Sequence, residues 1–282
     1  MSFVNGFLSL PEKMRKTTFA ALMISILTLA CSSNKYAVSN RSYKHQARAL
    51  AKIIRLVPAP DSLAYPFPWV GTTNFGLRKP NFVIIHHTAQ NSCGQTLQTF
   101  TSPASQVSAH YVICKDGTVH HMLSDYLRAW QAGVGSWGND KDLNSSSVGI
   151  ELDNTGFDSF PAPQINSLLA VLATLKRTYN IPAANFIGHA DIAPTRKNDP
   201  GVYFPWQLLA QNGFGLWYDD TTQVTVPQNF NSLQALRIIG YSVKDSGAAI
   251  VAFKRHFEMQ DSSSTLTEGD KKILCNLTGK YE

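Results

Sequence analysis

The middle of the chain alternates between short apolar runs and polar turns, and some runs contain or lead into side chains that can do chemistry. Asn81 to Ile85 is apolar after its first residue and leads directly into His86. A short run this rich in β-branched residues predicts a strand buried on both faces. Ser147 to Asp153 predicts a further core strand, which contains the carboxylate of Glu151. We therefore expect side chains that bind metal or take part in catalysis at the ends of these strands.

Turn and helix signals extend this pattern into a domain. Ala109 to Cys114 and Val119 to Met122 predict a hairpin, because a Lys-Asp-Gly-Thr turn joins them. Apolar residues at helical spacing predict a helix from Pro163 to Tyr179. Asn185 to His189 predicts a short strand that again ends on a histidine. Interleaved strands and helices predict a mixed α/β domain over about residues 65–220.

The carboxy-terminal part is predicted to be a small helical module. The polar stretch Thr221 to Asn231 predicts a linker. Beyond it, apolar residues at helical spacing around Leu236 and Phe253 predict two amphipathic helices, and Glu268 to Leu277 predicts a third short one. This module, about residues 228–282, is too small to hold a large active site.

The amino-terminal segment, residues 1–30, has the parts of an export signal. Basic residues at Arg15 and Lys16 precede the apolar run Phe19 to Ala30, which is shorter than the roughly 20 residues that a membrane-spanning helix needs. A small residue precedes Cys31. The segment therefore resembles a bacterial lipoprotein signal, in which this cysteine is lipid-modified and becomes the new amino terminus.

Two positions depart from the lipoprotein pattern and leave alternatives open. Such signals usually have leucine three residues before the cysteine and a small residue next, whereas this chain has Thr28 and Leu29. An ordinary secretory signal and a buried hydrophobic helix are the other interpretations. Because Ser32 is not the aspartate that resembles an inner-membrane retention signal, we expect an outer-membrane protein that faces the periplasm. Residues 31–64, polar and then proline-rich, predict a tether.

The charge balance argues against nucleic acid as the main partner. The formal charge of +6 falls to +4 without the first 30 residues, and no cluster of lysine and arginine interleaved with aromatics is present in the sequence. If Cys31 is lipidated, Cys93, Cys114 and Cys275 remain, so at least one thiol is unpaired within the chain. A Cys93–Cys114 bridge and a buried free thiol are both open at this point.

Three of the polar residues match the donor set of a catalytic zinc site. Such sites use three protein ligands from histidine and carboxylate and leave a fourth position open. His86, His189 and Asp199 offer this set, but their spacing has no compact ligand motif, and each has an ordinary structural explanation.

Three longer motifs resemble the zinc N-acetylmuramoyl-L-alanine amidases that are related to peptidoglycan recognition proteins, and in particular the outer-membrane lipoprotein members of the AmiD type. The motifs are Phe82 to Ala89, Ser147 to Leu152 and Gly188 to Gly201. The resemblance implies a mixed central β-sheet flanked by helices. It also implies zinc ligands at the three residues above, a catalytic carboxylate and a cationic helper; in this sequence these are His86, His189, Asp199, Glu151 and Lys197.

The chemistry requires these residue types. Zinc lowers the pKa of a bound water to roughly 7 and polarises a scissile carbonyl. Glu151, inside an apolar strand, is expected to have a raised pKa and to carry a proton from the water to the leaving amine. Lys197 would place an ammonium near the developing oxyanion. One residue departs from the family, which commonly has histidine where Gln131 stands, and this puts substrate contacts there in doubt.

These observations predict a zinc enzyme that hydrolyses the amide between N-acetylmuramic acid and L-alanine in peptidoglycan. The carboxy-terminal module resembles a three-helix peptidoglycan-binding domain, and a bundle that only supports the enzyme is the alternative. A non-catalytic peptidoglycan-binding protein is the main rival for the whole chain, but it would lack a ligand, whereas Asp199 is present here. A zinc site that acts on another amide bond is the third interpretation.

Overall fold

The computed structural model describes residues 34–55, 72–74, 76–77, 79–259 and 263–282. The predicted export signal and Cys31 lie outside these residues. The chain divides into two compact units, Met1 to Gly71 and Thr72 to Glu282, and each is treated by itself.

The described part of the first unit is a single long helix, α2 (Ala37–Ile54), with no buried residue. It lies inside the stretch predicted as a tether, for which no helix was expected. Among the residues that the structure describes, no helix is both long enough and apolar enough to span a bilayer.

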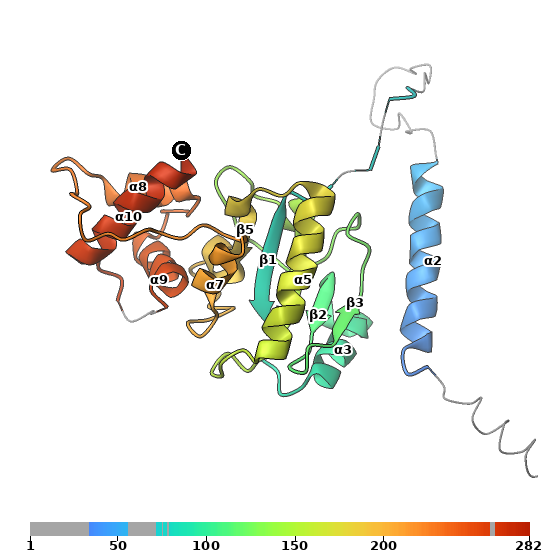
Figure 1. Ribbon diagram of the computed structural model, residues 1–282. Coiled ribbons are helices and arrows are strands. Elements are labelled where there is room, and N and C mark those ends of the chain that lie inside the picture. Colours follow the sequence, from blue (N-terminus) through green and yellow to red (C-terminus); the bar gives the residue numbers. More distant parts are fainter. Residues whose placement is uncertain (1–33, 56–71, 75, 78, 260–262) are drawn as a thin grey trace, which may run out of the picture. The chain divides into compact units, whose positions relative to one another are not determined.

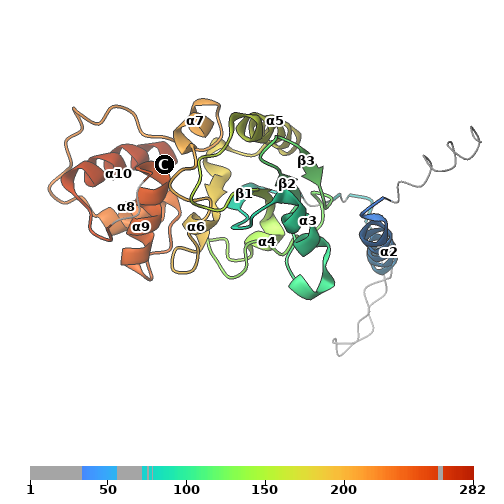
Figure 2. The ribbon, with the colours of Figure 1, turned by 90° about the horizontal axis from the view of Figure 1, so that it is seen from below.

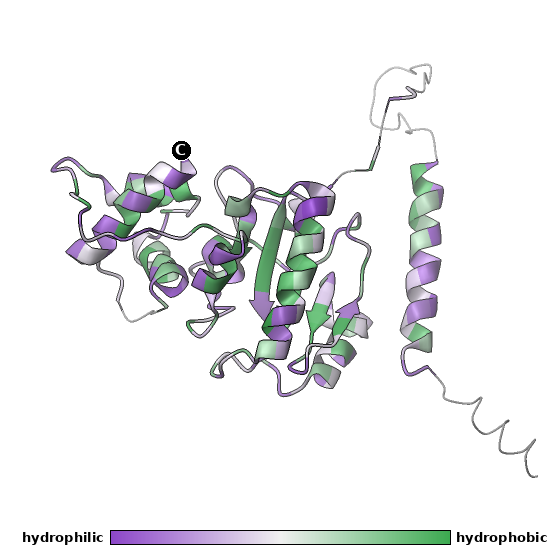
Figure 3. Cartoon of the chain, in the orientation of Figure 1, coloured by the Kyte–Doolittle hydropathy of each residue, from purple (hydrophilic) through white to green (hydrophobic). Residues whose placement is uncertain are grey.

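A five-stranded sheet forms the centre of the second unit, in the order β3-β2-β4-β1-β5. Its strands are β1 (Phe82–His87), β2 (Tyr111–Ile113), β3 (Val119–His121), β4 (Ser147–Leu152) and β5 (Phe186–Gly188). The β2–β3 pair is antiparallel and the other pairs are parallel, so the sheet is mixed as expected. Figure 3 shows β1 hydrophobic along its length and hydrophilic at its end, where the two histidines stand.

Helix α5 (Ala162–Tyr179) covers one face of this sheet (Figure 1). Its residues Ile165, Leu168 and Leu172 pack with Val83 and Ile85 of β1 in one apolar cluster. Side chains alternate along a strand, so Ile84 and His86 face the opposite side. The prediction of this helix and of the strands is confirmed. Because α5 covers one face of the sheet, polar side chains such as that of His86 lie on the other face.

Further short helices lie around the sheet. They are α3 (Cys93–Thr101), α4 (Leu143–Ser146), α6 (His189–Ile192) and α7 (Trp206–Gln211), with 3-10 turns at Pro103–Ser105 and Ala183–Asn185. Figure 2 shows α5 and α4 on opposite sides of the sheet. A disulfide joins Cys93 of α3 to Cys114 beside β2, with Cα atoms 5.3 Å apart. Of the two alternatives for these cysteines, the structure has the bridge, and Cys275 is free.

Three helices follow the linker, close to the expected positions: α8 (Ser232–Ile239), α9 (Ser246–Phe257) and α10 (Glu268–Tyr281). Asn231, Asp245 and Thr267 cap their amino termini through side-chain oxygens. Apolar residues of these helices share one core with Trp137, Ile187 and Ile192 of the sheet domain. The helices therefore pack against the sheet domain instead of standing apart from it.

Candidate metal centre and active site

Two of the predicted residues meet because β1 and β4 are parallel neighbours. Their register pairs His86 with Glu151 at the carboxyl end of both strands. Paired residues on neighbouring strands project to the same face, and here it is the face opposite α5. His86 is buried, and its ring therefore lies beside a carboxylate inside the protein.

The other two predicted ligands come from the segment that follows β5. His189 is the first residue of α6, and Asp199 lies on the loop ten residues later; both are buried. The Nδ1 atoms of His86 and His189 are 2.9 Å apart, and Asp199 Oδ2 lies 3.0 Å from the first and 3.1 Å from the second. The structure therefore brings the three residues together at one point.

Each imidazole has a partner at its outer nitrogen. His189 Nε2 lies 3.0 Å from the backbone carbonyl oxygen of Ala132, which can only accept, so Nε2 carries the proton. His86 Nε2 lies 2.5 Å from Gln131 Oε1. A neutral imidazole protonated at Nε2 has its lone pair on Nδ1, and both Nδ1 atoms face the centre of the cluster.

The orientation of the Gln131 amide follows from the groups behind it. Ser147 donates its hydroxyl proton to the carbonyl oxygen of Leu143, so the hydroxyl oxygen is left to accept from Gln131 Nε2 at 2.8 Å. The amide oxygen then has to face His86. Gly149 makes room for this arrangement, because a Cβ atom there would come within 2.6 Å of Gln131 Cγ.

This geometry suits a metal cation. Two neutral imidazole lone pairs and one carboxylate oxygen converge on a single point, as the ligand atoms of a metal ion do. Ligand atoms on a tetrahedral zinc lie roughly 3.3 Å apart, close to the spacing seen here. Two histidines and one carboxylate are also the protein ligands of many catalytic zinc sites. The residues present therefore fit the metal that the sequence analysis implies.

The pKa values of the cluster reflect the same convergence. Burial lowers the pKa of His86, but the carboxylates of Glu151 and Asp199 outweigh this and raise it above its ordinary value. Burial and the neighbouring His86 lower the pKa of His189 to about 4. Burial opposes ionisation of Asp199, yet hydrogen bonds with both histidines hold its pKa well below its usual range. Asp199 is thus an anion at neutral pH.

Glu151 is placed to exchange a proton near neutral pH. Burial raises its pKa to about 7, with His86 and Lys197 opposing the shift and Asp199 adding to it. Its Oε2 atom is buried and makes no hydrogen bond within the described part of the chain. A carboxylate with a free oxygen and a pKa near 7 suits a general base that later acts as an acid.

Lys197 lies close enough to Glu151 for its ammonium to lower the pKa of that carboxyl. It stands on the loop between α6 and Asp199, and it is half-buried. The structure thus places all five predicted site residues in one region.

One contact from outside this region reaches the segment that carries His189. Asp191 Oδ2 accepts a hydrogen bond from the backbone N–H of Gly188 at 2.7 Å. The same carboxylate accepts a bond from the Tyr241 hydroxyl at 2.7 Å and pairs with His256 Nδ1 at 2.8 Å. Tyr241 and His256 belong to the carboxy-terminal helical part, so this part helps to hold the strand end that presents His189.

Sequence reasoning missed two of these roles. Gln131 was considered only for substrate contacts, whereas here it holds the ring of His86. Asp191 drew no attention, although it lies inside the motif that contains His189 and Asp199. His87, adjacent to His86, does not join the cluster; its Nδ1 lies 2.8 Å from the carbonyl oxygen of Pro200 and thereby braces the Asp199 loop.

Comparison with known proteins gives a family profile that matches residues 76–202 and is described as N-acetylmuramoyl-L-alanine amidase. N-acetylmuramoyl-L-alanine amidase AmiD of Escherichia coli K12 is 29% identical over 270 residues, which cover 85% of this chain and 89% of the relative. The 1,6-anhydro-N-acetylmuramyl-L-alanine amidase AmpD of the same organism is 41% identical over 101 residues, or 36% of this chain and 55% of the relative.

Solved structures show the same similarity. E. coli AmiD in complex with the substrate anhydro-N-acetylmuramic acid-L-Ala-D-gamma-Glu-L-Lys superposes with a TM-score of 0.66 at 28% identity, over 77% of this chain and 96% of that one. AmpDh3 of Pseudomonas aeruginosa in complex with anhydromuramic pentapeptide gives a TM-score of 0.66 at 28% identity, over 78% and 99%. The matched fold extends beyond the sheet domain in both cases.

Proposed function

We propose that this chain, in which residues 76–202 form a domain of the N-acetylmuramoyl-L-alanine amidase family, is a zinc-dependent hydrolase of peptidoglycan. Its substrate bond is the amide between N-acetylmuramic acid and the L-alanine of the stem peptide. The observation that carries the proposal is the buried cluster of His86, His189 and Asp199 beside the carboxylate of Glu151. The names of the relatives, and the muropeptides bound in two related solved structures, support the choice of substrate.

His86 Nδ1, His189 Nδ1 and one oxygen of Asp199 would hold the zinc ion. Zinc there supplies a Lewis acid, which makes water acidic near neutral pH and polarises an amide carbonyl. Glu151 accepts a proton from the attacking water, whose oxygen bonds to the lactyl carbonyl carbon. As the carbon–nitrogen bond breaks, Glu151 returns the proton to the alanine nitrogen, and the products are a carboxylic acid and a free amine. Lys197 offers an ammonium to the negative oxygen that develops during attack.

Zinc rather than another divalent ion is part of the proposal. Imidazole ligands favour zinc over magnesium or calcium, which prefer oxygen ligands. Metal analysis of the purified protein is expected to give one zinc per chain, and the His189→Ala variant is expected to lose it.

Hydrolysis is tested by incubating the purified protein with sacculi and with soluble muropeptides and identifying the released peptides by mass. Free stem peptides with an amino-terminal L-alanine are expected, and a chelator should abolish their release. The Glu151→Ala variant is expected to keep its zinc and lose turnover by at least about 100-fold, since general acid–base catalysis contributes typically that much. Glu268→Ala, which removes an exposed carboxylate from α10, is the matched control and should remain active.

Two outcomes would reject parts of this proposal. Retained turnover by a zinc-loaded Glu151→Ala protein would remove Glu151 from the mechanism. Sacculi that bind the intact protein but release no peptide, with or without chelator, would support the rival function of a non-catalytic peptidoglycan-binding protein.

The proposed location is the outer membrane, with a lipid on Cys31 and the enzyme facing the periplasm. The order of basic start, apolar run and cysteine in the sequence supports it. In cells, the Cys31→Ala variant is expected to leave the membrane fraction, and the mass of the amino-terminal peptide should show acyl chains on Cys31 in the wild-type protein alone. A wild-type amino terminus without acyl chains would reject the anchor.

A further inference from the structure

Helix α2 has an unusual charge composition. From Asn34 to Pro60 the sequence contains no aspartate or glutamate. Basic residues recur through the helix instead, and Arg55 follows its end, so the chain contains a basic stripe that the sequence analysis overlooked. The positive charge of this segment therefore has no acidic partner within it.

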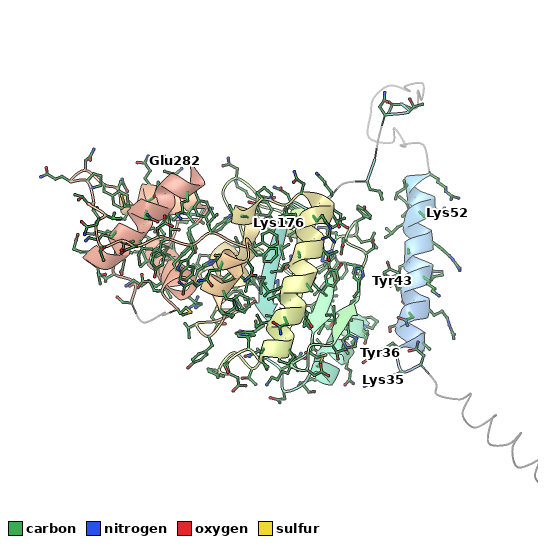
Figure 4. The ribbon with its side chains drawn as sticks, in the orientation of Figure 1. Lys35, Tyr36, Tyr43, Lys52, Lys176 and Glu282 are labelled. Atoms are coloured by element: carbon green, nitrogen blue, oxygen red, sulfur yellow. A yellow bond between two sulfur atoms is a disulfide. The ribbon has the colours of Figure 1, made fainter. Side chains whose placement is uncertain are left out.

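The basic residues lie on one side of the helix. At about 3.6 residues per turn, positions three, four and seven apart share a side. Basic residues follow this spacing: Arg41, Lys44, His45, Arg48, Lys52 and Arg55. A second set at the same spacing, on the other side, is apolar: Tyr43, Ala47, Leu50 and Ile54, with Ala51 and Ile53 at its margins. Figure 4 shows Tyr43 and Lys52 projecting from opposite sides of α2.

Both sides of the helix are exposed to solvent among the residues that the structure describes. No residue of α2 is buried, and the apolar side chains of Leu50, Ile53 and Ile54 are 45%, 62% and 78% exposed. An isolated amphipathic helix of this length gains most of its stability by burying its apolar side against another phase or molecule. A partner for α2 therefore has to accept an apolar strip and an adjacent basic strip together.

We propose that α2 lies along the surface of a membrane that contains anionic phospholipids. In that position the apolar side chains enter the boundary between headgroups and acyl chains, and the basic side chains reach the phosphate groups. Low overall hydrophobicity with clear separation of the two sides is typical of helices that lie on a bilayer and do not cross it. The inference concerns anchoring and is independent of the proposed amidase activity; the proposed lipid on Cys31 would place the helix beside the bilayer.

Other candidate partners would complement only the apolar side or only the basic side of α2. The peptidoglycan stem peptides offer carboxylates to the basic side but no continuous apolar surface to the other. A second copy of the chain could cover the apolar side, yet it would bring further positive charge and no anion. An anionic lipid surface provides both.

The test uses the full chain with Cys31→Ser, made without the lipid so that no acyl chain contributes to binding. Vesicles of phosphatidylglycerol and phosphatidylethanolamine are compared with vesicles of phosphatidylcholine in a sedimentation assay. Binding to the anionic vesicles, little binding to the neutral ones, and a loss of binding at high salt are expected.

Two double variants separate the contributions of the two sides. Arg48→Gln/Lys52→Gln is expected to weaken binding to anionic vesicles roughly tenfold or more, and Leu50→Ser/Ile54→Ser is expected to weaken it to a similar extent. Lys141→Gln/Arg177→Gln removes the same charge from exposed positions of the second unit and should bind like the parent. Hydrolysis of soluble muropeptides should be unchanged in all of these variants, so a failure of the amidase proposal would be seen separately.

Several results would overturn the inference. They are equal binding to neutral and anionic vesicles, equal loss in the Lys141→Gln/Arg177→Gln control, and no loss in either α2 variant. Binding of α2 to sacculi, or self-association that the Leu50→Ser/Ile54→Ser variant abolishes, without vesicle binding, would assign the helix to peptidoglycan or to a second copy instead.

Discussion

At the scale of single residues, the hydrogen bond between His86 and Gln131 determines which imidazole nitrogen is available to a metal. Gln131 presents its amide oxygen because Ser147 occupies its amide nitrogen. Partners of this kind orient metal-binding histidines, and their removal typically costs roughly 10–100-fold in metal affinity. Gln131 therefore orients the proposed metal ligand His86.

The Gln131→Leu variant is expected to bind zinc roughly 10–100-fold more weakly, because His86 Nε2 loses its acceptor. Gln131→Glu keeps an acceptor for His86 and is expected to bind zinc close to the wild-type level. Competition with a chromogenic chelator measures both, and circular dichroism checks the fold. If Gln131→Leu and the wild-type protein compete equally well, the hydrogen bond has no role in metal binding.

The sequence could predict the residues of the cluster but not the side chains that orient them. His86, Glu151 and His189 stand in or directly after apolar strands, but it is the resemblance of three motifs to known amidases that singled them out together with Asp199. The contact of Gln131 with His86 joins residues 45 positions apart and depends on the small Gly149 beneath the amide. No local pattern reports such a contact.

At the scale of elements, side chains of the carboxy-terminal helical module bind directly to a residue of the sheet domain. Tyr241 precedes α9 and His256 lies within it, and both bind the Asp191 carboxylate of α6. Trp206 of α7 stacks on the His256 ring with centroids 3.9 Å apart. These contacts favour a supporting role for the module, while peptidoglycan binding by residues 228–282 stays a prediction.

Removing the Tyr241 hydroxyl tests this support. Tyr241→Phe is expected to lower the free energy of unfolding by about 2 kcal/mol, since a hydrogen bond to a buried carboxylate contributes roughly 1.5–3 kcal/mol. Tyr281→Phe is the matched control, because the Tyr281 hydroxyl makes no hydrogen bond with any residue in the described ranges. Urea unfolding of the three proteins measures the difference, and identical midpoints for both variants would contradict the role of Tyr241.

Glu258, at the end of α9, gives the stability of this module a pH dependence. Burial raises its pKa to about 7, and the carboxylate of Asp270 adds to the shift, while Lys254 opposes it. A raised pKa means that the folded protein binds the proton more tightly than the unfolded chain. Its stabilising contribution is therefore complete below about pH 4.5 and is lost as the pH rises through about 7.

The Glu258→Gln variant is expected to raise the melting temperature at pH 8 and to change it little at pH 5. Glu268→Gln, at an exposed position of α10, should shift the melting temperature equally at both values of pH. An equal shift for Glu258→Gln at pH 5 and pH 8 would show that Glu258 ionises normally in the folded protein.

Helices and strands whose apolar residues recur at regular spacing could be predicted from the sequence, and those without such spacing could not. The apolar strands of the sheet and the stripe of α5 carry their own signals. Helix α3 has only Leu97 and Phe100 as large apolar residues, and its position depends on the Ser92 cap and the disulfide. Helix α2 has the pattern of an amphipathic helix, but the polar composition of this segment and the prolines after it led the sequence analysis to predict a tether without a helix.

At the scale of the whole molecule, the second unit combines a mixed sheet, a buried donor cluster and three supporting helices in one folded body. The first unit contributes a basic amphipathic helix after a predicted lipid attachment site. The proposed anchoring and the proposed catalysis therefore fall in different units of the chain, and variants of one unit are expected to leave the function of the other unchanged.

The most direct test of the central claim is hydrolysis of a muropeptide in water enriched in oxygen-18, with mass analysis of both products. Attack of water on the lactyl carbonyl predicts one heavy oxygen in the carboxylate of the muramic acid product and none in the released peptide, whose amino terminus is L-alanine. Heavy oxygen in a peptide carboxylate would show cleavage of another bond, and no zinc-dependent product at all would contradict the assignment of the site.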